Sequence, residues 1–151
     1  MSSMLEVPTE MVVGMRSALH SLIQAPAEGI AEVVDMAGRE EHPEWYLKHF
    51  VRLDRVLALL DVVGWCEADQ PVQVRIDLCE HRWAVLMAIE MMALVAADEL
   101  DELDQVDTER AKRSEPPKRT ATLNRAAAMS EFSWAAIIRI ARLDAAGETS
   151  L

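Results

Sequence analysis

Apolar residues recur at helical spacing along most of the chain, which predicts an all-α fold. In several stretches they fall three or four positions apart, as they do on the buried side of a helix. Candidate capping residues, together with Pro26, Pro43 and Gly64, divide these stretches into five predicted helices. We expect them over residues 9–24, 27–40, 43–63, 78 to at least 103, and about 120–146. The pattern therefore predicts a five-helix, bundle-like single domain over residues 1–151, in which 1–8 and 147–151 are flexible and 113–119 form a loop.

One short stretch, residues 72–76, has the period of a β-strand instead. Val72, Val74 and Ile76 alternate there with polar residues. A strand cannot satisfy its backbone alone, so it must pair with residues 64–67, pair with its copy in a second subunit, or stay extended. We expect an extended linker or a very short β-ribbon.

The predicted helix that begins near residue 78 is apolar on two opposite sides. One stripe has coiled-coil-like spacing and contains Leu78, Val85, Ile89, Met92, Ala96 and Leu103. The other contains Trp83, Leu86, Met87, Leu94 and Ala97. A helix that is apolar on two sides is buried on two sides, either as the central helix of the domain or against a second subunit. We favour a homodimer, with Trp83, Leu86, Met87, Glu90 and Leu94 as interface residues.

Glu90 lies inside this second stripe and has two interpretations. It is either a carboxylate adapted by its apolar surroundings to act as a general acid or base, or an interface residue paired with an arginine such as Arg52, Arg55 or Arg139. We favour the paired residue, because an isolated buried charge is very costly.

The last predicted helix also has two apolar sides, which suggests burial between partners. One side carries Phe132, Ala136, Ile140 and Leu143, and the other carries Trp134, Ile137, Ile138 and Ala141. Packing against the preceding helix is the simplest explanation. Methionines such as Met11, Met15, Met87, Met91 and Met92 either fill gaps in a core or form an adaptable groove for a partner helix.

Charge is distributed unevenly along the chain. The formal net charge of −11 argues against binding of free nucleic acid. Residues 98–109 contain seven acidic side chains and no basic one, whereas 110–125 contain six basic side chains and one acidic one. Either the acidic segment recognises a basic protein partner, or the basic segment folds onto the acidic one of its own or a sister chain, which is the default. The residues expected to contact a basic partner are Asp98, Asp101, Glu102 and Asp104.

Acidic clusters are the pattern that suggests metal-dependent catalysis. They contain Glu28, Glu32, Asp35, Glu40, Glu41 and Glu44. Glu41–Glu44 and Glu32–Asp35 resemble, in part, the E-x-x-E and E-x-x-D motifs that hold magnesium in all-α nucleotide pyrophosphatases. Their order is reversed, however, and Pro43 places the first motif at a helix start, where carboxylates favour the helix dipole while facing solvent. We therefore expect no metal and no cofactor, and we keep a metal-dependent nucleotide hydrolase as the alternative.

Targeting signals and cysteine usage favour a cytoplasmic protein. The first eight residues lack the features of a signal peptide, and the most apolar stretch, residues 83–97, is interrupted by Glu90 and too short to span a bilayer. Cys66 and Cys79 are expected to be reduced thiols.

Together the patterns predict a non-enzymatic protein–protein interaction or regulatory protein, homodimeric, with no membrane contact. A further alternative is an acidic protein that neutralises a basic protein partner.

Overall fold

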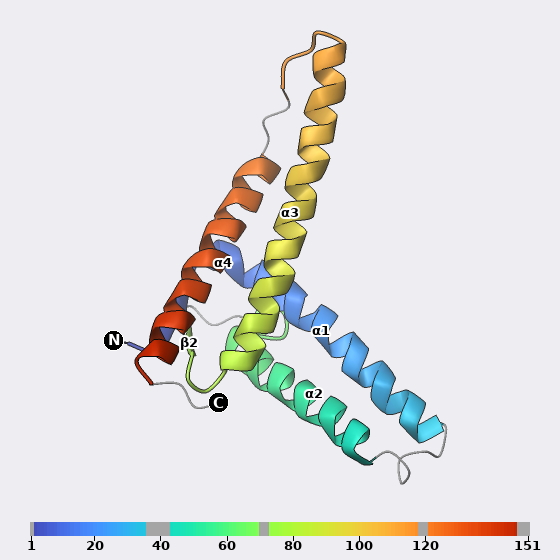
Figure 1. Cartoon of the computed structure of the whole chain (residues 1–151), viewed down its shortest axis with the longest axis vertical. Coiled ribbons are helices and arrows are strands. Elements are labelled where there is room, and N and C mark those ends of the chain that lie inside the picture. The colour runs from blue at the N-terminus through green and yellow to red at the C-terminus, as the bar shows by residue number, and fades with distance from the viewer. Residues whose placement is uncertain (1, 36–42, 70–72, 118–120, 148–151) are drawn as a thin grey trace.

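The structure, a computed structural model, describes residues 2–35, 43–69, 73–117 and 121–147 (Figure 1). Its elements in chain order are strand β1 (Met4–Val7), helix α1 (Thr9–Asp35), helix α2 (Pro43–Val63), the 3₁₀ turn η1 (Glu67–Asp69), strand β2 (Val74–Asp77), helix α3 (Arg82–Lys112) and helix α4 (Ala121–Ala145). The predominantly helical character predicted from the sequence is confirmed, and a small two-stranded sheet is added to it.

The helices form two hairpins. Figure 1 shows α1 and α2 side by side as one hairpin, and α3 and α4 as the other. In this view α1 passes behind α3, and the two hairpins extend in different directions from the region where they meet. The largest fully buried side chains come from every helix and from β2: Met15, Leu19, Leu59, Leu60, Ile76, Ile89, Met92 and Leu143. The core therefore lies where the hairpins and the sheet meet.

The prediction of five helices is wrong, because the described residues contain four. Helix α1 continues through Pro26, where we expected one helix to end and another to begin. A proline in a helix interior removes one hydrogen bond and costs about 3 kcal/mol. The apolar positions before and after it, such as Leu19, Ile23, Ile30 and Val33, stay in phase with a single helix. An apolar pattern that stays in phase with one helix can outweigh a local cost of this size, since tertiary contacts supply most helical stability in proteins.

The other helix boundaries agree more closely with the sequence. Helix α2 begins at Pro43 and ends at Val63, and Gly64 follows with a φ of 100°, a value that favours glycine. Helix α3 begins at Arg82, four residues later than expected, and runs to Lys112. Residues 113–117 lie outside the helices as expected, whereas 118–119 and 148–151 lie outside the described residues.

The N-terminal segment is a strand instead of a flexible end. β1 pairs with β2 in antiparallel register, with Leu5 opposite Ile76 and Val7 opposite Val74. These four side chains are buried, and the alternation that predicted an extended segment at 72–76 therefore reflects a real strand at Val74–Asp77. Its partner is a segment that we had not considered.

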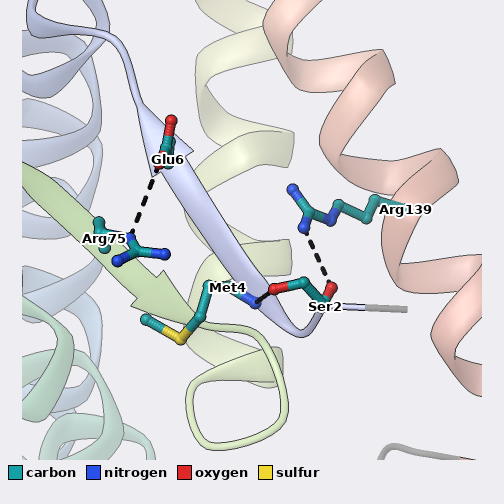
Figure 2. Close-up of polar contacts among 5 residues, drawn as sticks. All are labelled: Ser2, Met4, Glu6, Arg75 and Arg139. Carbon is teal, nitrogen blue, oxygen red and sulfur yellow. Dashed lines mark hydrogen bonds and ion pairs between the residues drawn. The ribbon is translucent and has the colours of Figure 1, made fainter.

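Polar contacts hold β1 to its neighbours (Figure 2). On the outer side of the sheet, Arg75 Nε lies 3.8 Å from Glu6 Oε1. Arg139 of α4 donates from Nη2 to the carbonyl oxygen of Ser2 at 3.0 Å. The strand thus connects the start of the chain both to β2 and to the last helix.

Candidate functional site

The outward side of α4 carries a row of exposed apolar residues. The buried side of α4 alternates spacings of three and four: Ala126, Met129, Ser133, Ala136, Ile140 and Leu143. Trp134 lies two positions, or about 200°, from Ala136, and Ile138 follows one turn later. Trp134 is 61% exposed and Ile138 is 48% exposed. We use the name α4 outer stripe for the exposed residues on this side of the helix, which are Ala127, Trp134, Ile138, Ala141 and Ala145.

The interface residues predicted on α3 lie in different surroundings. Trp83 and Leu86 are half-buried and pack against the core. Met87 is half-buried, whereas Glu90 is exposed and Leu94 is 58% exposed. The second stripe of α3 therefore belongs partly to the core of this chain, and only its far end is open.

Two of the three arginines considered as partners of Glu90, Arg55 and Arg139, have other contacts. Arg55 lies with its guanidinium carbon 5.8 Å from the centroid of the Trp83 ring, a cation–π arrangement. Arg139 donates to Ser2, as described above. Among the described residues no base lies within ion-pair distance of Glu90.

The four acidic residues predicted to contact a basic partner are all exposed on α3. In the part of the chain described, no basic side chain forms an ion pair with Asp98, Asp101, Glu102 or Asp104. The bases at the tip of the α3–α4 hairpin pair elsewhere: Lys112 with Glu109 at 3.0 Å, and Arg110 and Arg113 with Glu115, each at 3.6 Å. Pairing among the described residues therefore leaves these four carboxylates available.

A cleft of about 480 Å³ lies between α2 and the start of α3, lined by Asp54, Arg55, Ala58, Cys79, Glu80, His81, Arg82, Trp83 and Ala84. Several of its charged groups contact a neighbouring side chain, such as Arg55 with Trp83 and Arg82 with Asp144. Arg82 donates from Nε and Nη2 to the two carboxylate oxygens of Asp144, at 3.1 and 2.6 Å. These hydrogen bonds raise the pKa of Arg82 above its ordinary value. The cleft thus serves as a junction that connects α2, α3 and α4.

A second hollow, of about 100 Å³, lies between α1, α3 and α4. Small residues of α1 line one wall, and methionines and a valine line the others: Gly14, Ser17, Ala18, Ser21, Met91, Met92, Val95 and Met129. We call it the methionine groove. Met11 and Met15 are buried in the core and do not line it. The sequence pattern pointed to Met91 and Met92 as possible groove residues, but not to the α1 wall. The pattern that could have indicated this wall is a set of small residues three, four and seven positions after Gly14.

Metal ligands are not gathered in the part of the structure that can be described. No group of three His, Cys, Asp or Glu side chains there could hold an ion. Glu40, Glu41 and His42 lie outside the described residues, as do the side chains of Glu28, Glu32, Asp35 and Glu44. Cys66 and Cys79 are not joined in a disulfide, and no helix in the described ranges is long and apolar enough to cross a bilayer.

Comparison of the chain with protein-family models, with curated proteins and with solved structures finds no match in any of the three. Its function must therefore be argued from its own surfaces.

Proposed function

We propose that this protein acts through protein–protein contact, without catalysis, and that it forms a homodimer through the α4 outer stripe. The observation that carries the proposal is the exposure of Trp134 and Ile138 on the side of α4 opposite its buried side. Large exposed apolar side chains grouped on one face mark interaction surfaces, and tryptophan is enriched among the residues that dominate binding energy.

The order of residues in the stripe favours a second copy of the same helix, running antiparallel. If residue 134 lies opposite residue 138 of the partner, a two-fold axis relates the helices at the level of residue 136. The same register places Ala127 opposite the partner's Ala145, so that large residues meet at the centre and small ones at the ends. A two-fold interface requires this kind of self-complementarity.

Charge along one edge of the stripe supports the same register. Glu131 and Arg142 are exposed and lie on the same edge of α4, since eleven residues correspond to nearly whole turns of a helix. Neither forms an ion pair with another described residue. In the antiparallel register Glu131 lies next to the partner's Arg142, and the pairing occurs twice. Opposite charges on flanking positions set orientation in paired helices.

The test is the mass of the protein in solution. Wild type at micromolar concentration should sediment at twice the 16.9 kDa of one chain. Trp134→Ser should weaken the dimer by about 30-fold or more, as expected for an anchor residue, while the free energy of unfolding of the monomer changes little. Val13→Ser removes an equally exposed apolar residue from α1 and serves as the control.

A charge exchange tests the register. Arg142→Glu should weaken the dimer, and Glu131→Arg combined with Arg142→Glu should restore it. A monomeric wild type would overturn the proposed dimer, and a dimer unaffected by Trp134→Ser would overturn its location. The remaining elements of the proposal are a cytoplasmic setting and a regulatory or adaptor role.

A further inference from the structure

The methionine groove is too small for a metabolite but suits one side chain. Small-molecule sites usually exceed about 300 Å³, whereas this groove holds about 100 Å³, roughly the space that one leucine or methionine side chain occupies. Its base is formed by Met92 and Met129, both buried. A Cβ added at Gly14 would lie 3.5 Å from Met92 Cε and 3.0 Å from Met129 Cε. The absence of a side chain at residue 14 therefore helps to keep the groove open.

The walls of the groove suit a helix better than an extended segment. Ser17 and Ser21 are exposed on the α1 wall, one turn apart, and Ser21 Oγ donates to the Ser17 carbonyl at 3.1 Å. Small residues let a second backbone approach closely. On the other wall Met91 is half-buried and Val95 is 44% exposed. Methionine adapts its shape to an inserted side chain, which is why it is common on surfaces that bind helices.

Charge determines which helix fits. On α3, Asp98 and Glu102 follow Val95 by three and seven residues, so they share its side of the helix at about 4.5 and 10.5 Å along the axis. Both are exposed and have no ion-pair partner among the described residues. The exposed α1 residues that line the groove, Ser17 and Ser21, are uncharged. A helix that places one apolar side chain in the groove would therefore meet two negative charges within its next two turns.

We propose that the methionine groove and the neighbouring carboxylates of Asp98 and Glu102 bind a basic amphipathic helix of a partner protein. One leucine, isoleucine or methionine of that helix fills the groove, and lysines or arginines one and two turns away pair with the two carboxylates. Asp101 and Asp104 lie toward other sides of α3, so the acidic segment predicted from the sequence divides into residues that contact this helix and residues that do not. This proposal goes beyond the homodimer and does not depend on it.

The probe is a fluorescently labelled synthetic helical peptide with a leucine anchor and lysines three and seven positions away. Fluorescence anisotropy should show saturable binding that weakens as salt is added. Replacing both lysines with glutamates, or the anchor leucine with alanine, should abolish it. Equal binding of the lysine and glutamate peptides, or no binding of the lysine peptide, would overturn the proposal.

Variants of the protein locate the site. Asp98→Lys combined with Glu102→Lys should weaken binding about tenfold or more, whereas Asp104→Lys, the same charge change on another side of α3, should have little effect. Ser21→Phe should fill the groove and abolish binding while leaving the circular dichroism spectrum unchanged. If that variant folds poorly, Val95→Ser offers a milder change at the opposite wall, with a smaller loss of affinity expected.

The proposed helix-binding groove and the proposed dimer can be tested separately. Trp134→Ser should leave peptide binding unchanged, and Ser21→Phe should leave the dimer mass unchanged. Equal weakening by Asp104→Lys would show that the peptide is attracted by overall charge alone, which would overturn the proposed site. Loss of the dimer in Ser21→Phe would identify a second copy of this chain as the occupant and would overturn the assignment to a partner helix.

Discussion

Replacing Arg16 with methionine should destabilise the protein, because it removes a buried hydrogen bond to Gly64. Arg16 lies on α1 and is only 8% exposed. Its Nε donates to the carbonyl oxygen of Gly64, 48 residues away, at 2.9 Å. Gly64 ends α2, where its own N–H donates to the carbonyl of Leu60 at 2.8 Å. The guanidinium therefore connects α1 to the point where the chain leaves α2 and turns toward β2.

The size of the expected loss of stability in Arg16→Met follows from two opposing effects. A hydrogen bond that involves a charged group contributes about 1.5 to 3 kcal/mol, and its loss also leaves the buried Gly64 carbonyl without this donor. Methionine preserves most of the apolar stem of Arg16 and removes the cost of burying a charge, which offsets part of the loss. We expect the free energy of unfolding to fall by about 2 kcal/mol, with Tm lowered by roughly 4 to 8 °C.

The assay is urea unfolding followed by far-UV circular dichroism at one fixed protein concentration, because a dimer makes stability concentration-dependent. Arg52→Met makes the same chemical change at an exposed position on α2 and should stay within about 0.5 kcal/mol of wild type. If Arg16→Met unfolds like wild type with an unchanged m value, the hydrogen bond to Gly64 does not stabilise the fold and the reasoning is refuted.

Three further substitutions probe the core, the junction between α2, α3 and α4, and the outer half of α3. Leu143→Ala, at a fully buried site, should cost about 2 to 5 kcal/mol in chemical unfolding, and a cost no larger than that of Leu47→Ala, at an exposed site, would argue against tight packing there. Asp144→Asn should lower stability by about 1 kcal/mol, with a smaller loss in high salt. Titration of Arg82 does not make the stability from this ion pair depend on pH near neutrality. Folding raises the pKa of Arg82, so the stabilisation is complete below the unfolded-state pKa and is lost only as pH rises through the folded-state pKa. Glu99→Met should raise Tm, because Glu99 Oε2 is buried and has no hydrogen-bond partner among the described residues; a lower Tm would show that this carboxylate stabilises α3.

Parts of the fold could be predicted from local sequence alone. This was possible where a single residue determines the backbone conformation, or where the spacing of apolar residues determines which side of a helix is buried. Pro43 and Gly64 predicted both ends of α2. The coiled-coil-like stripe of α3 is also correct, with Val85, Ile89 and Met92 among its buried members. In both cases the information lies within a few turns of helix.

Features that depend on distant partners could not be predicted in this way. Strand β1 is four residues long, and its pairing with β2 joins segments about 70 residues apart. Phe50 has the spacing of a core residue but is 52% exposed, because periodicity predicts an apolar side without showing what covers it. Trp134 was recognised as part of a second apolar side, and only the fold shows that no described element of the same chain covers it.

The sheet also imposes an order on folding during synthesis. At roughly 5 to 20 residues per second, β1 emerges from the ribosome about 4 to 14 s before β2 is complete. During that interval α1 and α2 can pair, since their contacts are local, while Leu5 and Val7 have no strand beside them. Arg139, which binds the carbonyl of Ser2, is synthesised later still. The first strand of the nascent chain is therefore among the last parts to be secured, and until then its apolar side and unpaired backbone are exposed to chaperones and to other nascent chains.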